Sequence, residues 1–102
     1  MIQKTEEING LYVTMVEKRK VGGTWYRAYK NLPDSVLEAW VLAFEEPSEE
    51  YGLQGGRISK LSIRRLQGGA KTWEALYDRG MECEPKAEDA KEMYTQLIEM
   101  YN

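Results

Sequence analysis

The chain contains no histidine, a single cysteine and no long apolar run among its 102 residues. The lack of histidine removes the commonest general base and metal ligand of proteins. Because Cys83 is the only cysteine, no internal disulfide bond can form. No segment approaches the roughly 20 apolar residues of a membrane-spanning helix, and residues 1–10 lack the apolar core of a signal peptide. We therefore expect a soluble protein that is not exported.

The composition is typical of one globular domain. Hydrophobic residues make up 42% of the chain and charged residues 30%, whereas disordered chains carry much less apolar material. A length of 102 residues is usual for a single domain. We expect one domain over residues 1–102, with a flexible segment over residues 1–9. Residues 45–56 combine Pro47 with several glycines and glutamates, which predicts a long loop.

Five segments have the composition or the alternating pattern of β-strands. Val36–Phe44 is apolar on both alternating faces, so we expect it near the middle of the sheet. The alternation in Thr72–Tyr77 places Trp73, Ala75 and Tyr77 on a common face. The predicted strands are Leu11–Lys18, Trp25–Tyr29, Val36–Phe44, Ile58–Leu66 and Thr72–Tyr77.

From Pro85 to Tyr101 the period of apolar residues changes to 3.6, which predicts an amphipathic helix. Pro85 suits the first turn, where its missing N–H costs nothing. A sheet that precedes one amphipathic helix buries its apolar face best when the helix lies across it. We expect an α+β fold: an antiparallel sheet of four to five strands with the C-terminal helix packed on one face. The predicted apolar stripe of the helix consists of Ala87, Ala90, Met93, Tyr94, Leu97, Ile98 and Tyr101.

Acidic side chains form two groups. At about 100° per residue, the group on the predicted helix falls within about an 80° arc opposite the apolar stripe. This acidic ridge is either an ordinary solvated face or a contact for a cationic groove, because carboxylates four residues apart are spaced much like phosphates. The second group is a solvated loop, a partner contact or a divalent-metal site. The ridge comprises Glu84, Glu88, Glu92 and Glu99, and the loop group comprises Glu45, Glu46, Glu49 and Glu50.

Cations gather around the predicted strand Ile58–Leu66. A row of cations on a sheet can track phosphates while nearby aromatic rings stack on bases, or it can protect an exposed strand from edge-to-edge pairing. The net charge of −3 opposes nucleic-acid binding. In a core of this size we expect at least two of the three tryptophans to be buried, and an exposed one would serve as a binding anchor. The cations are Arg57, Lys60, Arg64 and Arg65.

The residues predict no catalytic site, cofactor or metal. A metal-dependent nuclease needs a lysine beside its carboxylates, but Trp40 occupies that place after Asp34 and Glu38. The glycine-rich run Tyr51–Arg57 lacks the spacing of phosphate-binding loops, so we interpret it as a structural loop. We therefore expect a protein that is not an enzyme.

Two stretches resemble a family of small proteins from phages and mobile elements of Bacillota. Residues 51–61 read YGLQGGRISKL and residues 77–80 read YDRG, where family members show YGI-x-x-GRISKL and YDRGW. Leu53 and Met81 stand in place of the family's isoleucine and tryptophan. The resemblance covers about residues 36–100 and implies an accessory protein. We expect the matching residues to define a loop and a buried ion pair between Asp78 and an arginine. They are Gly52, Gly55, Gly56, Arg57, Ser59, Lys60, Asp78, Arg79 and Gly80.

The size, acidity and motif also resemble type II-A anti-CRISPR inhibitors of that group. The resemblance implies a non-catalytic inhibitor in the cytoplasm of a bacterial host. Its partner would be a type II CRISPR effector nuclease, in which it blocks guide RNA loading or DNA engagement. The acidic groups would then speed encounter with the cationic channel of the nuclease and compete with phosphates. The alternative is a nucleic-acid-binding accessory protein that uses the strand from Arg57 to Arg65.

Overall fold

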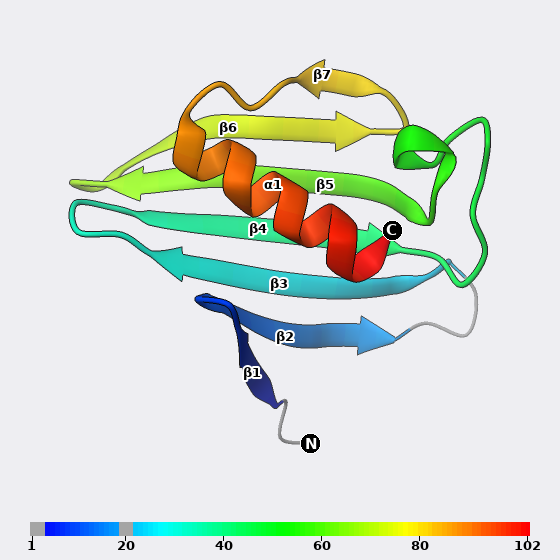
Figure 1. Cartoon of the computed structure of the whole chain (residues 1–102), viewed down its shortest axis with the longest axis horizontal. Coiled ribbons are helices and arrows are strands. Elements are labelled where there is room, and N and C mark those ends of the chain that lie inside the picture. The colour runs from blue at the N-terminus through cyan, green and yellow to red at the C-terminus, as the bar shows by residue number, and fades with distance from the viewer. Residues whose placement is uncertain (1–3, 19–21) are drawn as a thin grey trace.

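The computed structural model of the chain describes residues 4–18 and 22–102. An antiparallel sheet of seven strands carries one α-helix across one of its faces (Figure 1). Each strand pairs with its neighbours in the sequence, so the order in the sheet runs from β1 to β7. The elements are β1 (Thr5–Ile8), β2 (Leu11–Lys18), β3 (Thr24–Asn31), β4 (Val36–Ala43), the 3₁₀ turn η1 (Leu53–Gly55), β5 (Ile58–Gln67), β6 (Ala70–Asp78), β7 (Met81–Cys83) and α1 (Glu88–Tyr101).

The α+β fold with one C-terminal helix on an antiparallel sheet is confirmed, but the expected number of strands is too low. The five predicted strands correspond to β2 to β6. The two additional strands are short edge strands of four and three residues. Most of their residues are exposed, so they lack the apolar alternation by which a strand is recognised in a sequence. Of the segment over residues 1–9 that we expected to be flexible, residues 1–3 lie outside the described residues, and Thr5–Ile8 form the edge strand β1.

The prediction that Val36–Phe44 is a central strand is confirmed, because β4 is the fourth of the seven strands. Leu37, Ala39 and Val41 are buried on the side of the helix. Glu38 and Leu42 point to the other side and are also buried. Burial on both sides explains the continuous apolar run of this strand.

Small side chains under the helix allow it to pack closely on the sheet. The strand register places Val13, Ala28, Ala39, Ile63 and Ala75 in one row across β2 to β6, and all of them are buried. Three members of this row are alanines, which leave room for large side chains from the helix. The buried residues of α1 are Ala90, Met93 and Leu97, while Tyr94, Ile98 and Tyr101 pack against the edge of the core, as the apolar stripe predicts.

The helix begins later than predicted. The backbone of Ala87 is still extended and caps the helix, so the first helical residue is Glu88. Pro85 is not in the first turn, and Glu84 is not on the helix. The reason is that β7 keeps the chain extended as far as Cys83, and residues 84–86 then connect this edge strand to the helix. Among the described residues, no helix is long and apolar enough to cross a membrane.

Candidate functional site

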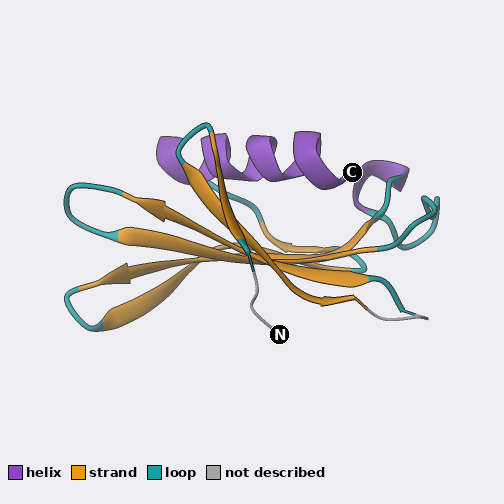
Figure 2. Ribbon diagram, turned by 90° about the horizontal axis from the view of Figure 1, so that it is seen from below, coloured by secondary structure: helices purple, strands orange, loops and turns teal. Residues whose placement is uncertain are grey.

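One face of the sheet carries the helix, and no segment of the described residues packs across the opposite face (Figure 2). We call this uncovered side the open face. Cross-strand partners point to the same side of a sheet, so the register defines which side chains the open face presents. They form three rows across β2 to β6: Tyr12, Tyr29, Glu38, Arg64 and Trp73; Thr14, Arg27, Trp40, Ser62 and Leu76; and Glu17, Trp25, Leu42, Lys60 and Asp78.

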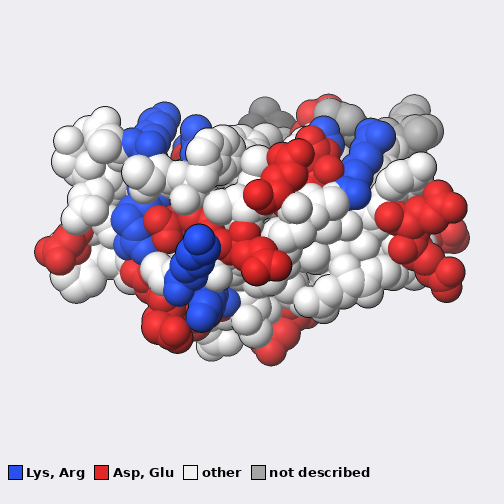
Figure 3. Space-filling view, turned by 90° about the horizontal axis from the view of Figure 1, so that it is seen from above, with Lys and Arg blue, Asp and Glu red and all other residues white. Residues whose placement is uncertain are grey.

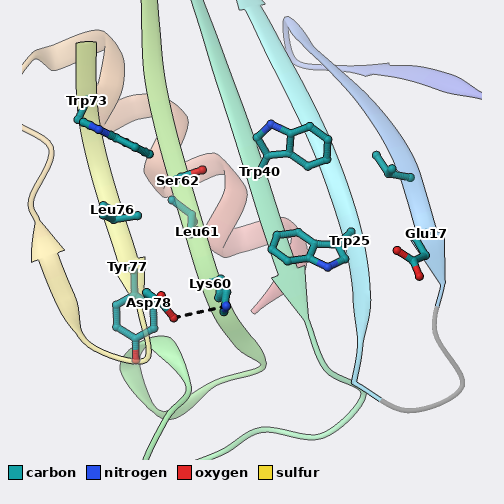
Figure 4. A pocket seen from close by; sticks show the side chains of 11 residues that line it. Glu17, Trp25, Trp40, Lys60, Leu61, Ser62, Trp73, Leu76, Tyr77 and Asp78 are labelled. Carbon is teal, nitrogen blue, oxygen red and sulfur yellow. Dashed lines mark ion pairs between the residues drawn. The ribbon is translucent and has the colours of Figure 1, made fainter. Parts of the chain in front are cut away.

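All three tryptophans of the chain lie on the open face (Figure 4). Trp25 and Trp40 meet edge to face, with ring centroids 6.3 Å apart. Trp73 lies across β5 from this pair, and the three rings border a hollow of about 440 Å³. Trp73 is 55% exposed and the other two are half-buried. The expectation that two tryptophans are buried is therefore wrong, whereas an exposed one is present.

The alternation predicted for Thr72–Tyr77 is wrong at Trp73 because β6 contains a bulge. The register passes from Ile63 opposite Ala75 to Arg64 opposite Trp73, which leaves Glu74 as an extra residue. The bulge turns Trp73 to the open face, while Ala75 and Tyr77 remain buried in the core under the helix.

The centre of the open face holds a buried carboxylate between two arginines. Glu38 is 6% exposed and accepts hydrogen bonds from Arg27 at 2.6 Å and from Arg64 at 2.7 Å. Burial alone would raise the pKa of Glu38, but the hydrogen bonds and positive charges of the two arginines hold it below its usual range. The guanidinium of Arg27 lies 4.5 Å from the ring centre of Tyr29, and that of Arg64 lies 5.6 Å from that of Trp73. These contacts order the aromatic rings of the open face.

Acid is expected to destabilise the protein through this carboxylate. The folded-state pKa of Glu38 lies below the unfolded-state value of about 4.3. Its contribution to stability is therefore complete above that value and is lost as the pH falls through the folded-state pKa. Urea unfolding at pH 7 and pH 3 measures this loss, which Glu38→Gln should reduce and the exposed-site control Glu99→Gln should not. Equal pH dependence in Glu38→Gln and the parent protein would contradict the role of Glu38.

The predicted basic strand does not form one surface. Arg65 points to the helix side, where it donates hydrogen bonds to Asp89 at 2.6 Å and to Glu74 at 3.3 Å. Its hydrogen bond lowers the pKa of Asp89. Arg57 lies in the loop that precedes β5, so only Lys60 and Arg64 share the open face. The alternation of β5 is sufficient to separate Arg64 from Arg65, since residues two apart share a face.

The two acidic groups differ from their predicted arrangement. Glu84 precedes the helix, and two of the three remaining ridge residues pair with lysines: Glu88 with Lys91 at 3.6 Å and Glu92 with Lys30 at 3.3 Å. The loop group is exposed, and acidic side chains gather at the end of the molecule where this loop lies (Figure 3). The described residues contain no group of three or more acidic or cysteine side chains that could hold a metal ion. The loop group comprises Glu45, Glu46, Glu49 and Glu50.

The residues of the two sequence motifs meet at the same end of the sheet. The hydroxyl of Tyr77 donates a hydrogen bond to the carbonyl of Tyr51 at 2.9 Å, and the N–H of Arg79 donates to the carbonyl of Ser59 at 3.1 Å. Asp78 lies 3.8 Å from Lys60, and about half of its side chain is exposed. The expected buried pair between Asp78 and an arginine is therefore wrong. The motif residues define how the 45–56 loop is attached to β5 and β6.

A comparison with known families finds a match that covers β3 to α1. Residues 24–102 match a family described as a domain of unknown function, DUF7678. The matched part begins with β3 and includes the three tryptophans, both motifs and the helix. No curated protein and no solved structure matches the chain. Because the match extends over most of its length, the chain belongs to the DUF7678 family.

Proposed function

We propose that this protein is a non-enzymatic binding protein that docks a partner protein on its open face. The observation that carries the proposal is the gathering of all three tryptophans on the side of the sheet without a helix. Tryptophan, tyrosine and arginine are the residue types that contribute most to protein–protein affinity. Trp73 combines high exposure with a position beside a hollow, which suits an anchor residue that becomes covered on binding.

The charges of the open face favour a protein over a nucleic acid. Its cations are Arg27, Lys60 and Arg64, and each of them is paired with Glu38 or Asp78. A nucleic-acid strand requires cations that neutralise phosphates, whereas these three cations are already engaged by two carboxylates of the protein, Arg27 and Arg64 sharing Glu38. A mixture of paired charges around apolar rings is typical of the polar rim of a protein interface.

A nucleic-acid-binding accessory protein is the second candidate, with a smaller set of binding residues than the sequence predicted. The observation that favours it is the stacking of Arg64 on Trp73, since aromatic rings beside cations bind single strands. Only Lys60 and Arg64 of the four cations of the predicted strand can take part from the open face. Submicromolar binding of a labelled oligonucleotide that is lost in Lys60→Glu and Arg64→Glu would replace our first proposal with this one.

A type II RNA-guided nuclease is the first partner protein to test. The resemblance of the motif points to it, and the exposed acidic loop supports it. The four glutamates of this loop form no ion pair with any residue in the described parts of the chain. Free carboxylates would speed association with the cationic channel of such a nuclease. Binding there would block guide loading or DNA engagement without catalysis.

Truncation of Trp73 is expected to weaken docking by about 30-fold without unfolding the protein. Loss of an anchor residue costs about 2 kcal/mol or more at an interface, and the exposure of Trp73 makes its contribution to folding small. Binding of purified type II-A nuclease to Trp73→Ala and to the parent protein, measured by biolayer interferometry, checks this. Met15→Ala is the matched control, because Met15 is 49% exposed and pairs with Tyr26 on the other side of the sheet.

Three outcomes separate the parts of the proposal. Equal affinity of Trp73→Ala and the parent protein would contradict docking on the open face. Reversal of Glu45, Glu46, Glu49 and Glu50 to lysine should slow association and remove its salt dependence if the acidic loop takes part. If the nuclease does not bind at all, the partner is wrong. The open face is then tested by capture of proteins from bacterial lysate after nucleic acids are digested. Trp73→Ala should capture less of a bound protein than Met15→Ala and the parent protein.

A further inference from the structure

A second hollow, of about 500 Å³, lies at the end of the sheet that carries the motif residues. Its lining comes from the end of β4, the 45–56 loop, the turn between β6 and β7 and residues 22–24 at the start of β3. Figure 1 shows that the 45–56 loop and the turn between β6 and β7 lie at the same end of the sheet. Its size is within the range of small-molecule sites. The side chains that matter for its chemistry are those of Phe44, Glu45, Glu46, Ser48, Tyr51, Arg57 and Arg79.

The hollow is lined by two arginines that have no acidic partner among the described residues. Of the arginines that the structure describes, Arg27, Arg64 and Arg65 each pair with at least one carboxylate. Arg57 and Arg79 form no ion pair with any residue in 4–18 or 22–102, yet both line this hollow. A guanidinium presents a planar fork of donors that matches the oxygens of a phosphate group. Two arginines that line one hollow and lack an ion pair with the described residues supply the kind of donors that such a group requires.

The backbone at Arg79 is held in an unfavourable conformation. Its φ angle is +58°, in the left-handed region that glycine adopts most readily. Its N–H donates to the carbonyl of Ser59, the residue that the irregular register of β4 and β5 leaves without a partner on β4. An arginine at a position that favours glycine costs stability, and such strain is concentrated at functional sites. The turn between β6 and β7 requires this conformation, and it places Arg79 at the end of the sheet where the hollow lies.

The other lining residues suit a ligand that also carries an aromatic ring and N–H donors. Phe44 is 37% exposed and Tyr51 is 54% exposed, so each offers a ring on which a planar group can stack. The hydroxyl of Ser48 accepts a hydrogen bond from the N–H of Tyr51 at 3.1 Å, which leaves its own proton free to donate. The carboxylates of Glu45 and Glu46 accept hydrogen bonds only, and they would repel a ligand that is purely anionic.

From this combination we propose that the hollow binds a mononucleotide. The phosphate is held by Arg57 and Arg79, with the Ser48 hydroxyl as a further donor. The base stacks on Phe44 or Tyr51, and its amino and ring N–H groups donate to the nearby glutamates. The glycine-rich run contributes the wall of the hollow, in agreement with its lack of phosphate-loop spacing. This site does not depend on the open face, because none of its ligand groups belongs to the tryptophan hollow.

An NMR titration of ¹⁵N-labelled protein with guanosine monophosphate tests the proposal. We expect saturable shifts of the amides of residues 44–59 and 79–80, and dissociation constants that rise about 10–100-fold in Arg57→Gln and in Arg79→Gln. Lys71→Gln is the matched control, since Lys71 is an exposed cation at the opposite end of β6 that has no ion pair with the described residues. It should bind as the parent protein does.

Further ligands identify which part of the nucleotide is recognised. Guanosine and inorganic phosphate should each bind at least tenfold more weakly than the nucleotide, because each lacks one of its two recognised groups. Tyr51→Ala should weaken the binding of the nucleotide and leave the binding of inorganic phosphate unchanged. No shifts at millimolar nucleotide, equal affinity of phosphate and nucleotide, or unchanged affinity in both arginine variants would overturn the proposal. Amide spectra of the free variants show whether they are folded, so a loss of binding is interpretable.

Discussion

Replacement of Leu97 by alanine is expected to lower the free energy of unfolding by about 2–5 kcal/mol. Leu97 is completely buried between the helix and the sheet, in the same cluster as Met93 and Ile63. The variant loses the transfer free energy of the removed carbon atoms and leaves a cavity that the rigid sheet cannot fill. For a domain of this size, each kcal/mol lowers the melting temperature by about 4–8 °C, so the shift is large in a thermal melt.

Glu92→Gln on the same helix provides the control. The Glu92 side chain is 65% exposed, whereas that of its partner Lys30 is 15% exposed. The amide oxygen of a glutamine can still accept a hydrogen bond from Lys30, so the change in stability should stay below about 0.5 kcal/mol. A Leu97→Ala protein that melts at the temperature of the parent would show that the helix does not cover the core. A large effect in Glu92→Gln would show that the acidic side of the helix has a structural role.

The second large effect is expected in Gly52→Ala, with a loss of about 2–3 kcal/mol. A Cβ atom at this position would overlap the carbonyl oxygen of Gly56 and would lie 2.6 Å from that of Ser48. Both contacts are with backbone, which cannot move aside without opening the loop. The hydrogen bonds from Gly52 N–H to Ser48 and from Ser48 N–H to Gly56 would be lost with it. Chemical denaturation gives the loss of stability.

Limited proteolysis locates the damage. New cleavage should fall within residues 45–56 in Gly52→Ala, while the sheet stays resistant. The matched control is Gly80→Ala, another glycine of the motifs, where a Cβ atom would meet nothing within 4 Å and φ is not positive. That variant should be as stable as the parent. If the two variants behave alike, close approach of the backbone is not the reason for glycine at position 52.

Periodic patterns in the sequence predicted those features that depend on the residues of a single helix or strand. The buried face of α1 and the central place of β4 follow from spacing within one segment, since burial imposes its period on the residues of a helix or strand. The short strands β1 and β7 bury too few side chains to impose a period, so no pattern revealed them. The first turn of α1 was misplaced because Pro85 fits equally well in an extended segment.

The candidate site depends on contacts between strands and loops, which the spacing of residues within one segment does not predict. The bulge at Glu74 decides on which side Trp73 lies, and nothing in the alternation of β6 indicates it. The contact of Glu38 with both Arg27 and Arg64 requires the registers of three strands, which turn lengths and packing set together. The hollow likewise combines Arg57 and Arg79, which belong to different motifs and lie 22 positions apart in the sequence.

The pairing of every strand with its neighbour in the chain has a consequence for synthesis on the ribosome. Apart from the 45–56 loop between β4 and β5, such a sheet closes short loops as it forms, so its hairpins can assemble in the order in which they emerge. The helix, however, follows all seven strands, and its 14 residues take about one to three seconds to translate at about 5–20 residues per second. During that interval the row from Val13 to Ala75 has no cover and is open to aggregation. Nascent chains arrested before Glu88 should therefore recruit chaperones, and chains arrested after the helix has emerged should not.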